Sequence, residues 1–180
     1  MMNQSEKPIK IIGLGNYLYR DEGLGIHVLP DIIRMFEEDP DVEVIEGSTD
    51  GLRLLEPIEQ ARGLLVIDAI ADHRVPGSVI VLEDDDIPKY FSLKMSMHQL
   101  GFQEVLQVAA LKDCYPEKIS IVGIQPESLV MGTELTDTID QAVPELKECI
   151  QEKVIQWKRE WHESSGIPQR TQVQSDSNLI

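Results

Sequence analysis

Residues 11–25 of this chain read IIGLGNYLYRDEGLG, and this stretch decides the fold. Its apolar start is typical of a buried strand, and Gly13 and Gly15 allow a sharp turn in which the backbone approaches a partner closely. The acids Asp21 and Glu22 precede a second glycine pair and a new apolar run, which predicts a helix. In an open α/β sheet such a turn lies at the carboxyl end of a strand, where ligands bind. Because packing does not need acids in that crevice, both call for a functional explanation.

The rest of the chain alternates predicted strands and helices. Strands are predicted at residues 8–13, 42–45, 63–70, 78–82 and 118–122, and helices at 23–38, 52–58, 98–111 and 135–161. Pro30 predicts a kink or a late start in the first helix, and Pro57 predicts the end of the second. Thr136 is a candidate N-cap for the last helix.

This alternation predicts an α/β fold: a three-layer αβα domain with a mostly parallel twisted sheet, of the phosphorylase/hydrolase type. Residues 63–70 are apolar almost throughout, as expected for a strand that is covered on both faces. In the helix at 98–111 we expect six apolar side chains to point inward: Leu100, Val105, Leu106, Val108, Ala109 and Leu111. The domain is expected to span residues 1–162, followed by a polar, disordered tail at 163–180.

The charge and composition narrow the classes of partner. Thirty-two acidic and 16 basic residues give a net charge of −16, which opposes binding to nucleic acid and to anionic membranes. No apolar stretch approaches the roughly 20 residues that span a bilayer, and residues 1–10 lack the apolar core of a signal peptide, so we expect a cytoplasmic protein. Cys114 and Cys149 have no metal-binding or disulfide spacing and are expected to be reduced thiols.

Three polar residues occupy positions where an α/β fold builds a site. Glu22 follows the first strand, Asp68 ends the most apolar strand, and His98 begins a helix after a loop. If the strands are neighbours, two carboxylates and an imidazole converge, a ligand set that first-row divalent metals such as nickel and zinc accept. Each residue also has a structural alternative: Glu22 as a helix first-turn acid, Asp68 as a turn cap, and His98 as a helix cap.

Other catalytic patterns are weak in this sequence. It contains no HExxH, GxSxG or GxxxxGK[ST] motif, so it lacks the signatures of zincins, serine hydrolases and P-loop enzymes. The Gly13-x-Gly15 pair lacks the third glycine of a dinucleotide-binding turn, because Leu18 stands in its place. A cofactor site of that kind is therefore weakly supported.

Five short motifs together resemble the nickel-iron hydrogenase maturation endopeptidases over most of residues 9–150. In chain order these motifs are GLGN (13–16) with DEG (21–23), VIEGST (44–49), IDA (67–69) with PG (76–77), HQLG (98–101) and GIQPES (123–128). Any one of them would be weak, but five in order at sensible separations are specific. The second motif departs from the family pattern, because Glu46 replaces the usual aspartate and Ser48 replaces a glycine.

The resemblance implies an endopeptidase that removes the C-terminal extension of a nickel-iron hydrogenase large-subunit precursor after nickel insertion. It implies that Glu22, Asp68 and His98 are metal ligands that recognise nickel supplied by the precursor. It identifies no nucleophile or general base. We expect a monomer that pairs with its substrate and binds neither nucleic acid nor membrane.

Two other functions remain open at the sequence level. Peptidyl-tRNA hydrolases share a Gly-Leu-Gly-Asn opening, but this chain lacks their following Pro-Gly, and its charge opposes tRNA binding. A non-peptidase metal-binding scaffold in hydrogenase assembly would be expected to keep the same ligands. A cleavage assay separates that scaffold from the peptidase.

Overall fold

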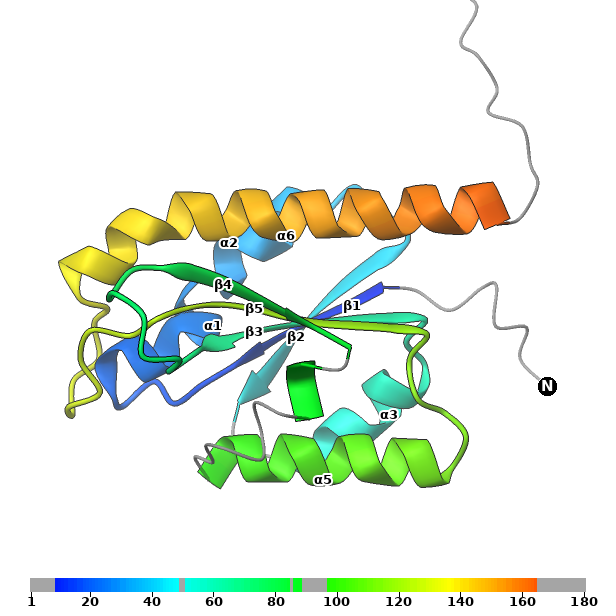
Figure 1. Ribbon diagram of the computed structural model, residues 1–180, viewed down its shortest axis with the longest axis horizontal. Helices are drawn as coiled ribbons and strands as arrows, with labels where there is room; N and C mark the ends of the chain where they lie inside the picture. Colours follow the sequence, from blue (N-terminus) through cyan, green and yellow to red (C-terminus); the bar gives the residue numbers. More distant parts are fainter. Residues whose placement is uncertain (1–8, 49–50, 85, 89–96, 165–180) are drawn as a thin grey trace, which may run out of the picture.

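The computed structural model describes residues 9–48, 51–84, 86–88 and 97–164, which fold around one five-stranded sheet (Figure 1). The strands are β1 (Ile9–Leu14), β2 (Val42–Ser48), β3 (Gly63–Ala69), β4 (Val79–Glu83) and β5 (Lys118–Ile124). The helices are α1 (Leu24–His27), α2 (Leu29–Phe36), α3 (Leu55–Glu59), α5 (Met97–Leu111) and α6 (Asp137–Ser164), with 3₁₀ helices η2 (Arg20–Gly23) and η3 (Gly51–Leu54). Within these residues no helix is both long and apolar enough to cross a bilayer.

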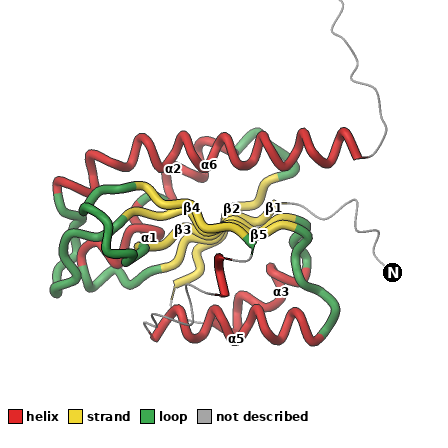
Figure 2. The backbone as a smooth tube through the Cα atoms, viewed as in Figure 1, coloured by secondary structure: helices red, strands yellow, loops and turns green. Residues whose placement is uncertain are grey.

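The sheet has the order β2-β1-β3-β5-β4, with β4 antiparallel to β5 and every other pair parallel. Helices α1, α2 and α6 cover one face, and α3 and α5 cover the other (Figures 1 and 2). This arrangement confirms the predicted three-layer α/β fold with a mostly parallel sheet. The antiparallel strand lies at an edge of the sheet, a common place for one in an otherwise parallel sheet.

The core consists of two apolar layers because successive residues of each central strand point to opposite faces. Leu65 and Ile67 of β3 pack with α1, α2 and α6, whereas Leu64 and Val66 pack with α3 and α5. Every residue of β1 and of β3 is buried. Asp68 is therefore exceptional as the polar residue of β3, and it lies near the carboxyl end of that strand.

Several local predictions need correction. Pro30 does separate two helices, but it lies in the first turn of α2, where its missing N–H costs no hydrogen bond. Pro57 does not end its helix: it also lies in a first turn, and α3 continues to Glu59. Strand β2 extends to Ser48, beyond the predicted end at residue 45.

The inward face of α5 was also predicted too broadly. Val105, Leu106 and Ala109 are buried, whereas Val108 is 38% exposed and Leu111 is 86% exposed. The side chain of Leu100 lies outside the described part of the structure. Leu111 is the last residue of α5, so nothing follows it on the helix to cover it. At the end of the chain, α6 continues through Ser164, and the rest of the predicted tail lies outside the described residues.

Candidate functional site

The order of the strands creates a crevice between β1 and β3. The chain passes from β1 to β2 on one side, and from β3 to the edge strand β4 and then back to β5 on the other. At such a switch point the following segments diverge, and they leave open space beyond the carboxyl ends of the two strands. Glu22 lies in η2, directly after β1, and Asp68 lies near the end of β3. Since η2 also contacts β3, the sequence has placed two carboxylates at the switch point.

The turn after β1 folds back so that Glu22 lies over Gly15. Gly15 has a φ of +140°, and a Cβ there would lie 2.1 Å from the carbonyl oxygen of Glu22. The Asn16 N–H donates to that same oxygen at 3.1 Å, and the Asn16 side-chain oxygen accepts the Leu18 N–H at 3.0 Å. The Gly-Asn pair therefore shapes a tight loop that fixes the backbone of Glu22, whose side chain is half-buried.

Asp68 is a buried carboxylate at the end of the central strand. Its side chain is 4% exposed, and its Oδ1 accepts the Ala69 N–H at 2.8 Å. It pairs in register with Gly123 of β5, at which a Cβ would lie 2.0 Å from the carbonyl oxygen of Asp68. The close approach of β5 therefore fixes the backbone at Asp68.

His98 is the second residue of α5, and its side chain lies outside the described part of the structure. The backbone direction still places it. Glu117, after α5, donates its N–H to the carbonyl of Arg62, which precedes β3, so α5 ends near the amino ends of the strands. Its first residues therefore lie toward the carboxyl ends, the edge that also carries Glu22 and Asp68 (Figure 1).

These three residues can supply oxygen and nitrogen donors suited to a first-row divalent metal. Among the described side chains, no group of three or more His, Cys, Asp or Glu is arranged to hold a metal ion. The structure thus brings Glu22 and Asp68 to one edge of the sheet, together with the start of the helix that carries His98. Their role as metal ligands stays a prediction.

The sequence predicts a functional role for Asp21 as well as for Glu22, but the structure gives Asp21 a structural role. Its carboxylate is 1% exposed and accepts four hydrogen bonds. The N–H groups of Glu127 and Ser128 donate to Oδ2 at 3.0 and 2.8 Å, the Thr136 N–H donates to Oδ1 at 2.8 Å, and the Thr136 hydroxyl donates to Oδ2 at 3.0 Å. Asp21 thereby fastens the loop after β1 to the loop between β5 and α6.

One sequence pattern indicates part of this role, since Thr136 immediately precedes α6, as expected of the predicted N-cap. Its carbonyl accepts the Ile139 and Asp140 N–H groups at 3.0 and 2.9 Å, as expected at the start of a helix. Its hydroxyl, however, donates to Asp21, 115 residues earlier in the chain. Spacing along the sequence does not reveal a partner at that distance.

Helix α1 contacts the strands through its backbone beside this site. A Cβ at Gly25 would lie 2.1 Å from the carbonyl oxygen of Leu14 and 2.4 Å from that of Ile67. A Cβ at Gly13 would lie 2.2 Å from the Gly25 carbonyl oxygen. Gly25 is thus required for α1 to lie directly on β1 and β3.

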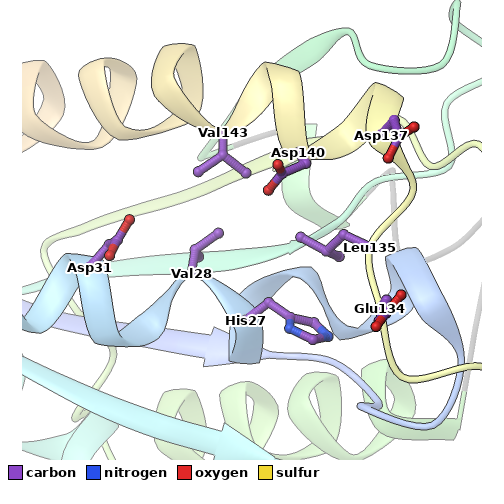
Figure 3. A pocket seen from close by; sticks show the side chains of 8 residues that line it. All are labelled: His27, Val28, Asp31, Glu134, Leu135, Asp137, Asp140 and Val143. Carbon is purple, nitrogen blue, oxygen red and sulfur yellow. The ribbon is translucent and has the colours of Figure 1, made fainter.

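An acidic pocket of about 340 Å³ lies between α1, α2 and the start of α6 (Figure 3). Its acidic lining residues are Asp31, Glu134, Asp137 and Asp140, and His27 lines it from α1. Asp31 is paired with Lys147 at 2.9 Å and with Arg34. The His27 ring points toward Glu134, and its Nε2 is buried without a hydrogen-bond partner.

Comparisons with known proteins support the resemblance noted in the sequence. A family model described as hydrogenase maturation protease matches residues 26–153. The hydrogenase expression/formation protein HupD of Rhizobium leguminosarum bv. viciae is 38% identical over 138 residues, which cover 76% of this chain and 68% of the relative. The hydrogenase 2 maturation protease of Escherichia coli is 32% identical over 144 residues, or 79% of this chain and 88% of the relative.

Among solved structures, the hydrogenase maturating endopeptidase HybD from E. coli aligns with a TM-score of 0.71 at 30% identity. The alignment covers 88% of this chain and 94% of that protein. The matched region spans only 59–68% of the length of four HupD and HoxM relatives. The family match favours the endopeptidase over the peptidyl-tRNA hydrolase alternative. A family match over more than two thirds of the chain and a fold shared with HybD together show that this chain belongs to the hydrogenase maturation proteases, a family of peptide-bond hydrolases.

Proposed function

We propose that this protein is an endopeptidase that removes the C-terminal extension of a nickel-iron hydrogenase large-subunit precursor once nickel has been inserted. Glu22, Asp68 and His98 recognise the nickel that the precursor carries. The protein acts as a monomer in the cytoplasm, and the nickel belongs to the substrate.

The placement of Glu22 and Asp68 at the switch point between β1 and β3 carries this proposal. Both come from segments whose backbone is fixed by close contacts: Glu22 over Gly15, and Asp68 beside Gly123. Carboxylates held in this way lose little conformational freedom when they bind a cation, because the scaffold has already ordered their backbone.

Positioning is the contribution that these residues make to the chemistry. By gripping a metal in the precursor, the three side chains hold the nearby peptide bond in one orientation, which can remove several kcal/mol from an activation barrier. The metal, when bound, can polarise the scissile carbonyl or lower the pKa of an attacking water. Cleavage would wait for nickel insertion, because without nickel the three ligands have nothing to hold.

Intact-mass analysis of the precursor tests the proposal. Nickel-loaded and nickel-free precursor are incubated with the protein, and loss of a C-terminal peptide is expected only from the loaded form. Asp68→Asn, Glu22→Gln and His98→Ala should each slow cleavage about a hundredfold or more, because the peptide bond is then misplaced. Glu38→Gln, at an exposed acid beyond the end of α2, is the matched control and should cleave at the normal rate.

Each other outcome removes a stated part of the proposal. If a verified nickel-loaded precursor stays intact, the peptidase function is wrong and the assembly-scaffold alternative is favoured. Cleavage of both forms would keep the peptidase and discard nickel recognition. Normal cleavage by Asp68→Asn would exclude Asp68 as a necessary ligand.

A further inference from the structure

Exposed apolar side chains gather on two loops at the edge of the sheet that carries Glu22. Fourteen large hydrophobic residues are exposed in the described structure, and six of them lie within residues 17–19 and 129–131. We call these six side chains the apolar surface: Tyr17, Leu18, Tyr19, Leu129, Val130 and Met131, with exposures between 37 and 79%. Contiguous exposed apolar area of this kind is unusual on a monomer and marks an interaction site.

The two loops form one structural unit. The Gly132 N–H donates to the Leu18 carbonyl at 2.9 Å, and the Arg20 N–H donates to the Gly132 carbonyl at 2.7 Å. Tyr19 and Gly132 form an isolated parallel β-bridge, and the Asp21 N–H donates to the Ser128 carbonyl at 3.3 Å. The six apolar side chains are thus brought together by backbone pairing and not by chance exposure of separate loops.

The same backbone connects the apolar surface to the candidate site. The Glu22 N–H donates to the Tyr19 carbonyl at 2.9 Å, and the Asn16 N–H donates to the Glu22 carbonyl at 3.1 Å. On the other side of the loop, the Tyr17 ring stacks on His27 with centroids 4.9 Å apart. A segment bound on this surface would therefore be held in fixed relation to the Glu22 backbone.

Charge around the apolar surface decides what kind of segment fits. Residues 16–20 and 128–132 contain no acid, although the whole chain carries a net charge of −16. The acidic pocket begins next to them, because His27 lines it while stacking on Tyr17, and Glu134 lines it two residues after Gly132 (Figure 3). Asp137 and Asp140 of that pocket are also first-turn acids of α6, where the helix dipole stabilises them, so the pocket by itself defines no ligand. It does require that whatever flanks a bound apolar segment be neutral or basic.

We propose that the apolar surface docks an apolar segment of the hydrogenase large-subunit precursor, flanked by neutral or basic residues, and so positions the scissile region beside Glu22. This inference rests on the proposed function. A second copy of this chain fits less well, because a two-fold symmetric contact would bring the two acidic pockets next to each other in a protein that already carries −16.

Binding measured separately from cleavage tests this docking role. Leu18→Gln and Met131→Gln replace exposed side chains, and each variant is first compared with the wild type by circular dichroism and thermal unfolding. Leu111→Gln is the matched control, because Leu111 is 86% exposed at the opposite end of the molecule. Biolayer interferometry with immobilised, full-length precursor gives Kd, and intact-mass kinetics give KM and kcat.

We expect Leu18→Gln and Met131→Gln to raise Kd and KM about tenfold, with kcat nearly unchanged, since they remove buried contact area without touching the reacting atoms. The control should bind like the wild type. Wild-type affinity in both variants, with the precursor still bound and cleaved, would overturn the docking role and leave the proposed function standing. Failure of the wild type to bind or cleave the precursor would instead overturn the proposed function, and the docking role with it.

Self-association gives one more decisive outcome. If sedimentation shows that the wild type dimerises and that Leu18→Gln abolishes the dimer without changing the affinity for the precursor, the surface belongs to a second copy, and the proposal is wrong.

Discussion

At the scale of single residues, Asp21 and Glu22 show how adjacent acids acquire different roles. Asp21 is buried and saturated by four donors from the loop after β5, whereas Glu22 is half-buried at the switch point. The difference follows from direction, because successive residues of a tight 3₁₀ turn point to different sides. Asp21 therefore fastens two loops together, whereas Glu22 lies at the crevice between β1 and β3.

Asp21→Ala should destabilise the protein by about 3 kcal/mol, because it leaves three N–H groups and a hydroxyl without their acceptor, and those of Thr136 are buried. Urea unfolding at pH 7 measures the loss. Glu38→Ala, at an exposed acid, should change the free energy of unfolding by less than about 0.5 kcal/mol. Equal stability of Asp21→Ala and the wild type would show that Asp21 does not fasten the two loops.

At the scale of the elements, α1 contacts the sheet through its backbone at Gly25. Because alanine adds only one methyl group, its substitution for Gly25 tests this contact directly. Gly25→Ala should fold poorly, because its Cβ would lie 2.1 Å from a backbone oxygen of β1 that cannot rotate away. Gly23→Ala should be much milder, because the nearest atom to its Cβ is a carbon of the His27 side chain at 3.1 Å. Yields of folded protein and thermal unfolding compare the two, and similar behaviour would contradict the backbone contact.

The contact between α2 and α6 should depend on pH through Asp31. Hydrogen bonds from Lys147 and then from Arg34 lower the pKa of Asp31 below its ordinary value of 3.8. Folding thus favours the ionised carboxylate of Asp31. Its contribution to the free energy of unfolding is complete above about pH 4 to 5, and it is lost as the pH falls through the lowered pKa of the folded protein.

A double-mutant cycle isolates this effect. Lys147→Met should reduce the free energy of unfolding at pH 7 but lose its effect near pH 3, and in an Asp31→Asn background it should have little effect at either pH. Urea unfolding at the two pH values provides the comparison. A Lys147→Met effect that persists unchanged at pH 3 would exclude the ion pair as its cause.

Much of the element scale can be predicted from the sequence because strands that are covered on both faces are mostly apolar. Residues 63–70 are the clearest example, since their apolar run both defined β3 and made Asp68 conspicuous. The end of α3 was misjudged because Pro57 was treated as a stop, although a proline in a first turn loses no hydrogen bond. The role of Asp21 was not readable, because its partners lie 106 to 115 residues away.

At the scale of the whole molecule, the surplus of 16 negative charges should oppose compaction at neutral pH. Raising sodium chloride from about 20 to about 200 mM shortens the Debye length from roughly 20 Å to under 10 Å and screens that repulsion. We expect the Tm at pH 7.5 to rise by about 2 to 4 °C, the shift that 1 kcal/mol gives in a chain of this size. Differential scanning calorimetry measures it, and a Tm that falls with salt would mean that attractive ion pairs dominate instead.

The hydrogen bonds of Asp21 also affect when the protein can complete its fold during synthesis. A chain emerging from the ribosome makes residues 11–25 first, but the hydroxyl and the N–H groups that hold Asp21 belong to residues 127–136 and appear only when most of the protein has been made. Until then the loop that carries Glu22 is not fastened to the segment after β5, even though β1, β2 and β3 can already pair. A truncated chain that ends before Thr136 would therefore lack the contacts that complete the edge of the sheet at Glu22. It would not compete with the full-length protein for the precursor.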